Sequence, residues 1–573
     1  MQKIFRGLII VAMLITAYLM VLAWQKDYAN VPQGATLATA NDPVNNSANV
    51  TSTDSGADLP NSTASASGDL PASTVTSNSG NVVNNNSAST DALISVSTDL
   101  YEVRINPIGG DIEYLALRDY DATLDSEQPF VLLENDGSRV YVAQSGLIGA
   151  NGIDTEAGRA KYSHTANSYT LAPGQDKLEV PLTIQQDGVT ITKTYTFTAG
   201  SYPIDLTYTI NNPTAQPWNG QMFAQLKRDD SKDPGMEDKG MLSMATYLGG
   251  AWGTPDSDYN KVKFGDFNDG DVTATSADGW VGIVQHYFVS AWTPNNFNGQ
   301  FFSRETGGDY FIGMNSPAIS VAPNTQTQIS ANLYAGPKVQ SLLETVAPGL
   351  NKTVDYGILW PISKLLFTIL EGIHKFIGNW GWSIIVLTIL VKIALMWFSN
   401  KSYYSMAKMR SLQPRLQALK EEHGDDRMKM SQAMMAIYKE EQVNPMAGCL
   451  PILLQMPIFL ALYWVLVESV ELRHAPWILW IQDLSAMDPW FILPIFMGVT
   501  MYAQQMLSPQ PTDPMQAKVM RFLPIIFTVF MLFFPAGLVL YWTVNNLFTM
   551  GQQYLVNRKV EQEQKKKTVK VLS

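Results

Sequence analysis

Hydrophobic and polar positions alternate along residues 189–197, where single Thr residues separate mostly apolar ones. A period of two residues predicts a strand with one buried face. Residues 178–184 precede this stretch across an Asp187-Gly188 turn, and residues 204–210 alternate in the same way. Successive antiparallel hairpins are therefore predicted, and we expect residues 92–345 to form a large all-β sandwich.

The hydrophobic pattern changes after Pro348 to the period of a helix. Between residues 362 and 377 one face carries Lys364, Thr368, Glu371 and Lys375, and the other face carries Leu366, Ile369, Leu370, Ile373, Phe376 and Ile377. This pattern predicts that segment 356–379 contains an amphipathic helix lying along a membrane surface. A core helix of the β-sandwich is the alternative.

Long apolar runs follow this segment and also begin the chain. They lie at residues 7–24, 382–398, 449–467, 490–507, 522–534 and 538–555. Such runs predict helices that cross a membrane, although each of the last two has only about 13 strongly apolar residues against the roughly 20 that a span needs. The first run is longer than the apolar region of a cleaved signal peptide, so we expect residues 1–28 to remain as a transmembrane anchor.

Basic residues predict how these spans are oriented. Lys3 and Arg6 place the N-terminus in the cytoplasm, and the basic loop 401–439 lies on the same side under the positive-inside rule. The last two runs must then be separate short spans joined at Phe534-Pro-Ala-Gly537, because a single span would put the basic C-terminal tail outside. The expected topology has six spans, both termini in the cytoplasm and residues 29–355 in the periplasm.

Composition divides the chain in the same way. The net charge of -12 arises from an acidic part before about residue 350, whereas the later part is basic. An acidic β-sandwich argues against nucleic acid as its ligand. Residues 29–91 are rich in Asn, Ser and Thr, which predicts a disordered linker. The membrane core is assigned to residues 380–555. The basic tail 556–573 is either solvated or in contact with lipid or the ribosome. The cytoplasmic loop is the other segment expected to contact the ribosome.

Motifs for enzymatic chemistry are missing from the sequence. Phosphate-binding loops, zinc-binding His pairs, nucleophile elbows and dinucleotide-binding turns do not occur. The five His residues are scattered, and the single Cys449 forms no internal disulfide. We therefore expect no catalytic residue, no metal site and no cofactor, in a protein that is not an enzyme.

Lys392 is the one charged residue within the apolar run 382–398. A straight helix would place it near the centre of a hydrocarbon core about 30 Å thick, where a charge is costly. No Asp or Glu lies deep in another predicted span, so the cation either faces a hydrated cavity or extends its side chain to the membrane surface. We favour a hydrated groove that opens to the cytoplasm.

Polar residues on the other predicted spans extend this candidate groove. Thr388 lies four residues before Lys392, on the same helix face. The remaining members are Gln455, Thr500, Gln504, Thr528, Tyr541 and Asn545. Hydrogen bonding between helices is the alternative role for the uncharged members.

The loop 399–445 has helical stretches on either side of His423-Gly424-Asp425, which predicts a cytoplasmic helical hairpin. Asp425 or Asp426 is the expected N-cap of the second helix. The hairpin is rich in Met, including Met406, Met409, Met430 and Met434, which predicts a flexible surface suited to varied apolar partners. Ordinary packing within the hairpin is the alternative role for these side chains.

Several longer motifs occur in order along the chain. They are Gln413-Pro-Arg-Leu-Gln417, Val443-Asn-Pro445, Leu454-Gln-Met-Pro-Ile-Phe-Leu-Ala-Leu-Tyr463, Trp480-Ile-Gln-Asp-Leu-Ser485, Asp488-Pro489, Ile492-Leu-Pro494, Asp513-Pro-Met515 and Phe534-Pro-Ala-Gly-Leu-Val-Leu-Tyr541. With these motifs, nearly the whole chain resembles the bacterial YidC-type membrane protein insertases, which are related to the Oxa and Alb proteins of organelles.

The resemblance implies an insertase and chaperone of the cell inner membrane. It would insert nascent membrane proteins through a hydrated groove, alone or with the Sec translocon. The β-sandwich would be a periplasmic β-supersandwich that looks like a sugar mutarotase without its activity. Lys392 stands where the family has an arginine, Thr388 matches a groove threonine, and Trp542 stands where a second groove tyrosine is common.

Two other classes of protein compete with this interpretation. A transporter or channel would also use polar spans, but the internal repeats or deep acidic residues expected of such a protein are not found. A membrane-tethered sugar-binding protein would instead place its function in the β-sandwich.

Overall fold

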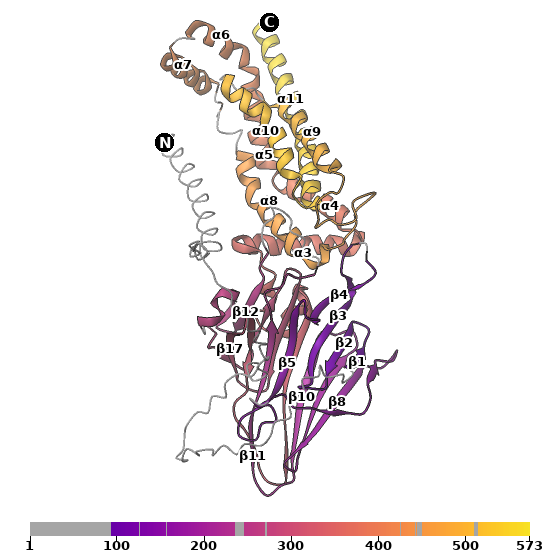
Figure 1. Ribbon diagram of the computed structural model, residues 1–573. Coiled ribbons are helices and arrows are strands. Elements are labelled where there is room, and N and C mark those ends of the chain that lie inside the picture. The colour runs from indigo at the N-terminus through magenta and orange to yellow at the C-terminus, as the bar shows by residue number, and fades with distance from the viewer. Residues whose placement is uncertain are drawn as a thin grey trace, which may run out of the picture. The chain divides into compact units, whose positions relative to one another are not determined.

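The computed structural model describes residues 93–124, 126–155, 158–234, 246–269, 272–423, 426–441, 443, 450–508 and 514–572. The predicted anchor 1–28 and linker 29–91 lie outside the described residues, as do Asp425 and Cys449. Within the described residues, strands occupy the part up to Pro337 and α-helices follow from Gln340 onwards (Figure 1).

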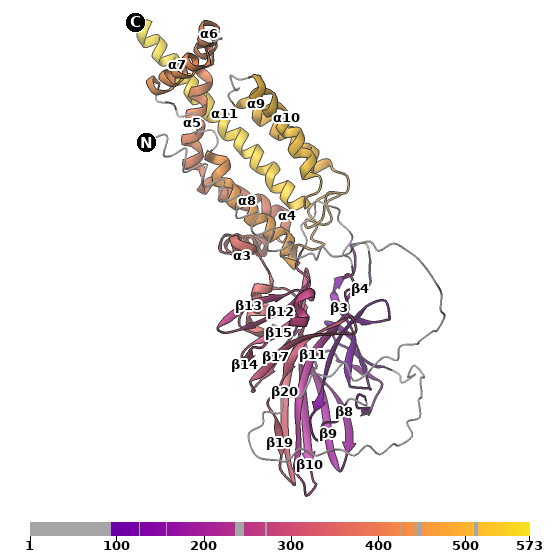
Figure 2. The ribbon, with the colours of Figure 1, turned by 60° about the vertical axis from the view of Figure 1, so that its left-hand side comes forward.

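Two sheets make up the described β-region (Figure 2). The first sheet runs in the order β14 (Thr275–Ser276), β17 (Gly299–Thr306), β18 (Asp309–Asn315), β11 (Trp218–Arg228), β5 (Val140–Ile148), β4 (Pro129–Asn135), β3 (Asp111–Asp121), β2 (Tyr101–Asn106), β1 (Ile94–Ser97) and β7 (Ser168–Thr170), with β19 (Ile319–Val321) paired to β11. The second runs in the order β13 (Ser257–Val262), β12 (Gly249–Thr254), β15 (Trp280–Val284), β16 (Phe288–Asn295), β20 (Thr325–Pro337), β10 (Pro203–Asn212), β9 (Val189–Thr198), β8 (Lys177–Gln186) and β6 (Ser163–His164). Buried apolar side chains from both sheets form one core, so the expected large β-domain is confirmed.

The hairpins predicted from the alternating pattern are present. β8, β9 and β10 pair antiparallel in sequence order, and Gln186 lies opposite Val189. Between these partners, Asp187 and Gly188 have φ angles of 50° and 81°. Two left-handed residues are what a tight two-residue hairpin turn requires, and Asp and Gly adopt that conformation readily.

The buried face of β9 includes one charged side chain, Lys193. Its Nζ donates to the carbonyl oxygens of Gly109 (2.9 Å) and Ser145 (3.1 Å). The Oδ1 atom of Asp111 lies 3.8 Å away. Burial lowers the pKa of Lys193 to about 7, and the negative charge of Asp111 opposes that shift.

The α-helices of the described residues follow in order along the chain. They are α2 (Gln340–Val346), α3 (Trp360–Ile377), α4 (Trp380–Ala394), α5 (Met396–Ser411), α6 (Gln413–His423), α7 (Arg427–Glu440), α8 (Leu450–Glu468), α9 (Ile492–Leu507), α10 (Pro514–Met531) and α11 (Ala536–Leu572). Short 3-10 helices occur at Phe264–Asp269, Leu350–Thr353, Gly357–Leu359 and Val470–Leu472.

Helix α3 covers the amphipathic segment of the sequence and lies across α4 and α8 (Figure 1). Leu366 and Leu370 of the expected apolar face are buried against these helices. Phe376, another member of that face, is 93% exposed, and Leu365 and Ile369 are also exposed beside it on the helix. The helix therefore has one apolar strip packed on protein and a second apolar strip facing outward.

The apolar run 382–398 is not one straight helix, which corrects the geometry assumed for Lys392. Helix α4 ends at Ala394, and α5 begins at Met396 with a bend of 68°. The bend turns α5 onto α11, where Gln552 donates a 2.7 Å hydrogen bond to Asn400 and Tyr403 is buried. This long-range packing is the physical reason for the break. Lys392 therefore lies within a turn of the bend.

Within its described residues, the predicted cytoplasmic loop 399–445 contains three helices, α5, α6 and α7, instead of the expected two. α5 ends at Ser411, and α6 begins at Gln413 with Pro414 in its first turn. Proline lacks an N–H and its ring clashes with the carbonyl four residues earlier, which favours a helix break here, although α8 and α10 continue through Pro457 and Pro524. The hairpin itself is present as α6 and α7, and Asp426 caps α7 by accepting from the N–H groups of Met428 and Lys429, both at 3.1 Å.

Helix α11 has 37 residues and continues the last apolar run through the basic tail. Within the described residues, no single helix combines the length and the apolar character needed to cross a membrane, although the bent pair of α4 and α5 does so together. Two shorter apolar helices are found at Leu453–Glu468 and Ile492–Leu507. The six spans therefore stay a prediction.

Candidate functional site

Lys392 is almost completely buried, at 4% exposure, between α4, α8 and α11. Its Nζ donates to Gln455 Oε1 on α8 (3.1 Å) and to Thr549 Oγ1 on α11 (2.9 Å). Both acceptors are uncharged. The cation is thus held by dipoles, which orient it without cancelling its charge.

Gln455 connects this cation to the middle of α11. Its Nε2 donates to Tyr541 OH at 2.8 Å and to the side-chain oxygen of Asn545. Because a lysine ammonium only donates, the amide oxygen of Gln455 must face Lys392 and its NH2 group must face α11. The structure therefore brings four predicted groove residues into one hydrogen-bonded cluster: Lys392, Gln455, Tyr541 and Asn545.

A second polar row lies between α9 and the neighbouring helices. Thr500 accepts a 3.3 Å hydrogen bond from Asn546 of α11. The Thr528 hydroxyl of α10 donates to the carbonyl of Pro524 in its own helix, at 2.7 Å. The Oε1 atom of Gln504 is buried and has no hydrogen-bond partner among the described residues. This row does not bond directly to the cluster around Lys392.

Two predicted groove residues have other surroundings. Thr388 is fully buried and donates to the Ile384 carbonyl of its own helix at 2.7 Å, so its hydroxyl is satisfied locally. Trp542 packs between Phe459 of α8 and Phe527 of α10, at ring-centroid distances of 4.8 and 5.1 Å. Its Nε1 is buried without a partner among the described residues. Trp542 therefore contributes mainly apolar packing.

The methionines assigned to the hairpin lie on two separate helices. Met406 and Met409 are on α5, whereas Met430 and Met434 are on α7. All four side chains are partly exposed. Met406 and Met409 therefore precede the α6–α7 hairpin, and Met430 and Met434 lie within it.

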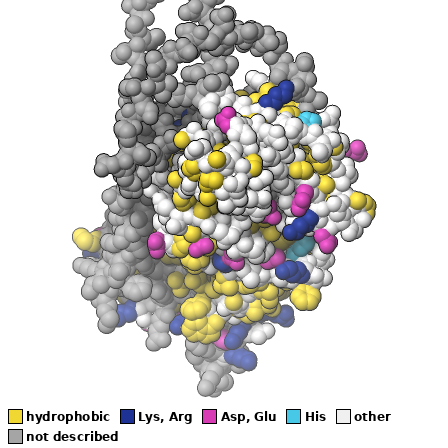
Figure 3. All heavy atoms as spheres, turned by 90° about the horizontal axis from the view of Figure 1, so that it is seen from below, with side chains coloured by type: hydrophobic (Ala, Val, Ile, Leu, Met, Phe, Trp, Pro, Cys, Tyr) yellow, Lys and Arg dark blue, Asp and Glu magenta, His cyan; other side chains and the backbone are white. Residues whose placement is uncertain are grey.

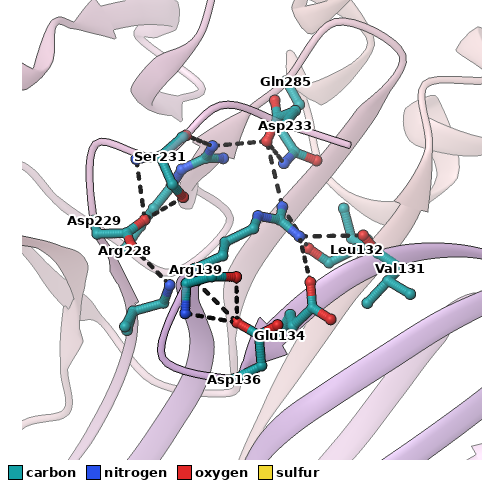
Figure 4. Close-up of polar contacts among 12 residues, drawn as sticks. Val131, Leu132, Glu134, Asp136, Arg139, Arg228, Asp229, Ser231, Asp233 and Gln285 are labelled. Atoms are coloured by element: carbon teal, nitrogen blue, oxygen red, sulfur yellow. Dashed lines mark hydrogen bonds and ion pairs between the residues drawn. The ribbon is translucent and has the colours of Figure 1, made fainter. Parts of the chain in front are cut away.

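A second polar cluster lies in the β-region (Figure 4). Asp233 Oδ1 accepts from Arg228 (2.7 Å), Arg139 (3.3 Å) and Gln285 (2.5 Å). Arg139 also donates to the Leu132 carbonyl at 3.1 Å. These contacts tie β4 and β5 to the end of β11, which is a structural role. Within the described residues, no group of three or more His, Cys, Asp or Glu residues could hold a metal ion.

The face of the β-domain that is seen from below shows no single charged patch among the described residues (Figure 3). Seen from below, acidic and basic side chains are scattered among hydrophobic and uncharged ones (Figure 3). The polar cluster among the helices therefore remains the stronger candidate site.

Comparison with known proteins decides the family. Residues 93–369 match the family model of the YidC periplasmic domain, and residues 372–565 match that of the 60Kd inner membrane protein. The membrane protein insertase YidC of Pseudomonas syringae pv. syringae is 49% identical over 573 residues, covering 98% of this chain and 99% of the relative. The chain belongs to the YidC-type membrane protein insertase family. The YidC of Azotobacter vinelandii is 48% identical and covers 97% of this chain and 98% of its own.

Solved structures include a YidC insertase as well. A crystal structure of active YidC with its first transmembrane domain resolved matches 81% of this chain and 92% of its own, with 19% identity and a TM-score of 0.37. A galactose mutarotase related enzyme from Lactobacillus acidophilus matches 42% of this chain and 97% of its own, with 8% identity and a TM-score of 0.30. The resemblance to the YidC family and the plan of a β-rich periplasmic domain followed by a helical region are confirmed.

Sequence reasoning missed one member of the cluster in this YidC-family protein. Thr549 accepts the shorter of the two hydrogen bonds from Lys392, yet it was not singled out. A signal was available, because Tyr541, Asn545 and Thr549 are spaced by four residues and therefore share one helix face. Extending that face by one turn would have found it.

Proposed function

We propose that this chain inserts nascent membrane proteins into the inner membrane and assists their folding, alone or with the Sec translocon. The observation that carries the proposal is the buried Lys392, held by Gln455 and Thr549 without a carboxylate partner in either bond. A positive charge left uncancelled at the junction of three apolar helices can stabilise polar or acidic groups of a passing segment.

The proposed path is a groove open to the cytoplasm, lined by the cluster around Lys392 and by the row containing Thr500, Gln504 and Thr528. Water and the cation lower the free energy of bringing the polar flank of a substrate partway into the bilayer. The unpartnered amide oxygen of Gln504 supports this, because a buried acceptor that lacks a protein partner is normally hydrated.

The outer faces of the helices support membrane placement. α9 and α10 expose many large apolar side chains, namely Ile495, Phe496, Val499, Tyr502 and Met506 on α9 and Phe522, Ile525, Ile526 and Val529 on α10. In water such a surface would be a liability, whereas lipid matches it. We infer that this pair is lipid-facing and short enough to thin the bilayer locally.

The driving force would come from the substrate itself. Its apolar segment gains free energy on entering lipid, and the membrane potential is worth about 2.3 kcal/mol per charge per 100 mV. The protein then lowers a barrier without forming or breaking a covalent bond. No cofactor is needed for this work.

The remaining segments have supporting roles in the proposal. α3 would lie in the periplasmic membrane surface, where its outward apolar strip meets lipid and Lys364 and Lys375 meet head groups. The α6–α7 hairpin and the methionines of α5 and α7 would receive the substrate on the cytoplasmic side, with the ribosome meeting this loop and the basic tail.

Site-specific crosslinking of a stalled nascent chain tests the path. In a Cys449→Ser background, single cysteines replace Thr528 and Gln504, and Ile526 serves as the matched control because it is on the same helix as Thr528 and 64% exposed. A single-span substrate carrying a thiol-reactive probe should form adducts at 528 and 504 and few at 526. Equal adduct yields at 526 and 528 would mean that substrates pass along the lipid-facing side instead.

A further inference from the structure

The loop joining α8 to α9, residues 469–491, holds bulky apolar residues in an unusual backbone conformation. Leu479 and Phe491 have φ angles of 55° and 57°. The other non-glycine residues with positive φ among the described residues are Asp187, Asn296, Asn324 and His474. Asp, Asn and His tolerate the left-handed region, whereas Leu and Phe adopt it only with steric strain.

Burial of the two side chains does not offset this strain. Leu479 is 74% exposed, and Phe491 is exposed as well. Strained residues persist where surrounding contacts fix them, and they concentrate at functional positions. The fixing contacts are present here, because Gln482 donates to the Leu479 carbonyl at 2.7 Å and Phe491 N donates to the Asp488 carbonyl at 3.2 Å.

An open apolar hollow of about 570 Å³ lies beside these residues, lined by Leu479, Trp480 and Trp490. The two indole rings are nearly parallel, with an interplanar angle of 11° and centroids 5.8 Å apart. The Nε1 of Trp480 donates inward to Asp488 Oδ1 at 3.0 Å, so its polar edge is satisfied by the protein. The hollow therefore offers indole faces and a leucine to whatever occupies it.

The loop is tied to the helices around it. The N–H groups of Ala536 and Gly537, where α11 begins, donate to the carbonyls of Ala486 (2.7 Å) and Leu484 (2.9 Å). At the other side, Asn379 before α4 donates to the Trp477 carbonyl at 3.3 Å. Held at two helix starts, the loop cannot fold its exposed side chains back onto the protein.

We propose that the α8–α9 loop is a lipid anchor, in which Leu479, Trp480 and Trp490 enter the boundary between head groups and acyl chains and the hollow accepts part of one phospholipid. Lipid fits better than a protein partner for two reasons. The exposed apolar surface is continuous with that of α9, through Phe491, Ile492 and Ile495. Tryptophan is also the side chain most suited to a membrane interface, because its ring is apolar while its edge is polar.

Such an anchor would fix the depth of the adjoining helices. The loop precedes α9 and bonds to the start of α11, so its position in the outer leaflet sets how far both helices enter the bilayer. This inference does not depend on a groove at Lys392, and either could fail alone.

Spin-label accessibility in the full chain tests the anchor. Single nitroxide-labelled cysteines replace Leu479, Gln482 and Ile495 in the Cys449→Ser background, in nanodiscs of phosphatidylethanolamine and phosphatidylglycerol. Gln482 is an exposed polar residue of the same loop, and Ile495 is an exposed residue of α9. We expect the ratio of oxygen to nickel-chelate accessibility at 479 to approach that at 495 and to exceed that at 482 several-fold.

Two outcomes would overturn the anchor. A ratio at 479 equal to that at 482 would place the loop in water. Shielding of 479 from both reagents would mean that a protein partner or a second copy covers it. Because labelling disturbs the strained backbone at Leu479, the same measurement at Trp490, which is 64% exposed and is not a residue with positive φ, must give the same answer.

Discussion

Two buried lysines show how differently one residue type can be used in this protein. Lys193 is enclosed by the β-core, where two carbonyl oxygens and the nearby Asp111 surround its ammonium. Lys392 lies among apolar helices, where its hydrogen-bond acceptors among the described residues are an amide oxygen and a hydroxyl. The first environment satisfies the cation within the fold. The second leaves its charge available, which is why we assign function to Lys392 and structure to Lys193.

The burial of Lys193 should make stability depend on pH. Its folded pKa is about 7, below the unfolded value of 10.5, so the unfolded chain binds more protons between these values and stability rises with pH there. Between pH 6 and 8.5 this one group should add about 2 kcal/mol to the free energy of unfolding of the β-domain.

The measurement compares the unfolding of wild type and Lys193→Met at both pH values in the detergent-solubilised full chain. Taking the difference between the two proteins removes the contribution of other titrating groups. A pH dependence that is the same in both proteins would contradict the assignment to Lys193.

The members of the site could be predicted from the sequence better than their contacts. Lys392, Gln455, Tyr541 and Asn545 were expected in one groove and do form one cluster. The hydroxyl of Thr388 bonds within its own helix, which the sequence could not reveal because either rotamer suits a threonine in a helix. Hydrogen-bond partners depend on how each helix is rotated, and that is set by packing.

At the scale of elements, α9 and α10 approach each other closely at Gly498. A Cβ atom at Gly498 would lie 2.1 Å from Thr528 Oγ1, so only glycine fits opposite that threonine. Small residues let helices approach closely in membranes, where packing and hydrogen bonds replace the hydrophobic effect. This contact places the polar row of α9 against α10.

Gly498→Ala should therefore destabilise the helical region by about 1–3 kcal/mol, the usual cost of overpacking. Thr528→Ala removes the obstructing hydroxyl and leaves the Cβ of residue 528 at 3.1 Å, so the double variant should recover most of the loss. Thermal unfolding midpoints of the two single variants and the double variant in detergent measure this. Purely additive losses would show that the two residues are not in contact.

The sequence carries a local signal for the break before α6 but none for the bend between α4 and α5. Pro414 is a local signal for the start of α6, because proline is favoured in a first helical turn and disfavours continuation of the preceding helix. The bend at Leu395 has no such residue, since the run from Trp382 to Phe398 contains neither Pro nor Gly. Packing of α5 on α11 causes it, and those partners are about 150 residues apart, as in the bond between Asn400 and Gln552.

For the whole molecule, the order of strands was the feature furthest from prediction. Local alternation predicted the β8–β9–β10 hairpins, but β10 also pairs with β20, so that Ile204 lies opposite Leu333. Pairing over such a separation depends on the complete topology and leaves no local pattern. The family, by contrast, was recognised from short motifs in order, because those motifs extend over the whole membrane region.

The central claim is that the positive charge of Lys392 lowers the barrier for a substrate's polar flank. Purified full-length variants Lys392→Arg, Lys392→Ala and Lys392→Glu are reconstituted in liposomes, with Lys375→Ala as the control because Lys375 is an exposed cation on α3. Insertion of a single-span substrate is then followed by protection from protease. We expect Arg and the control to match wild type, and Ala and Glu to insert at least about tenfold more slowly, equivalent to about 1.4 kcal/mol of barrier. Wild-type rates for both Ala and Glu would contradict the claim.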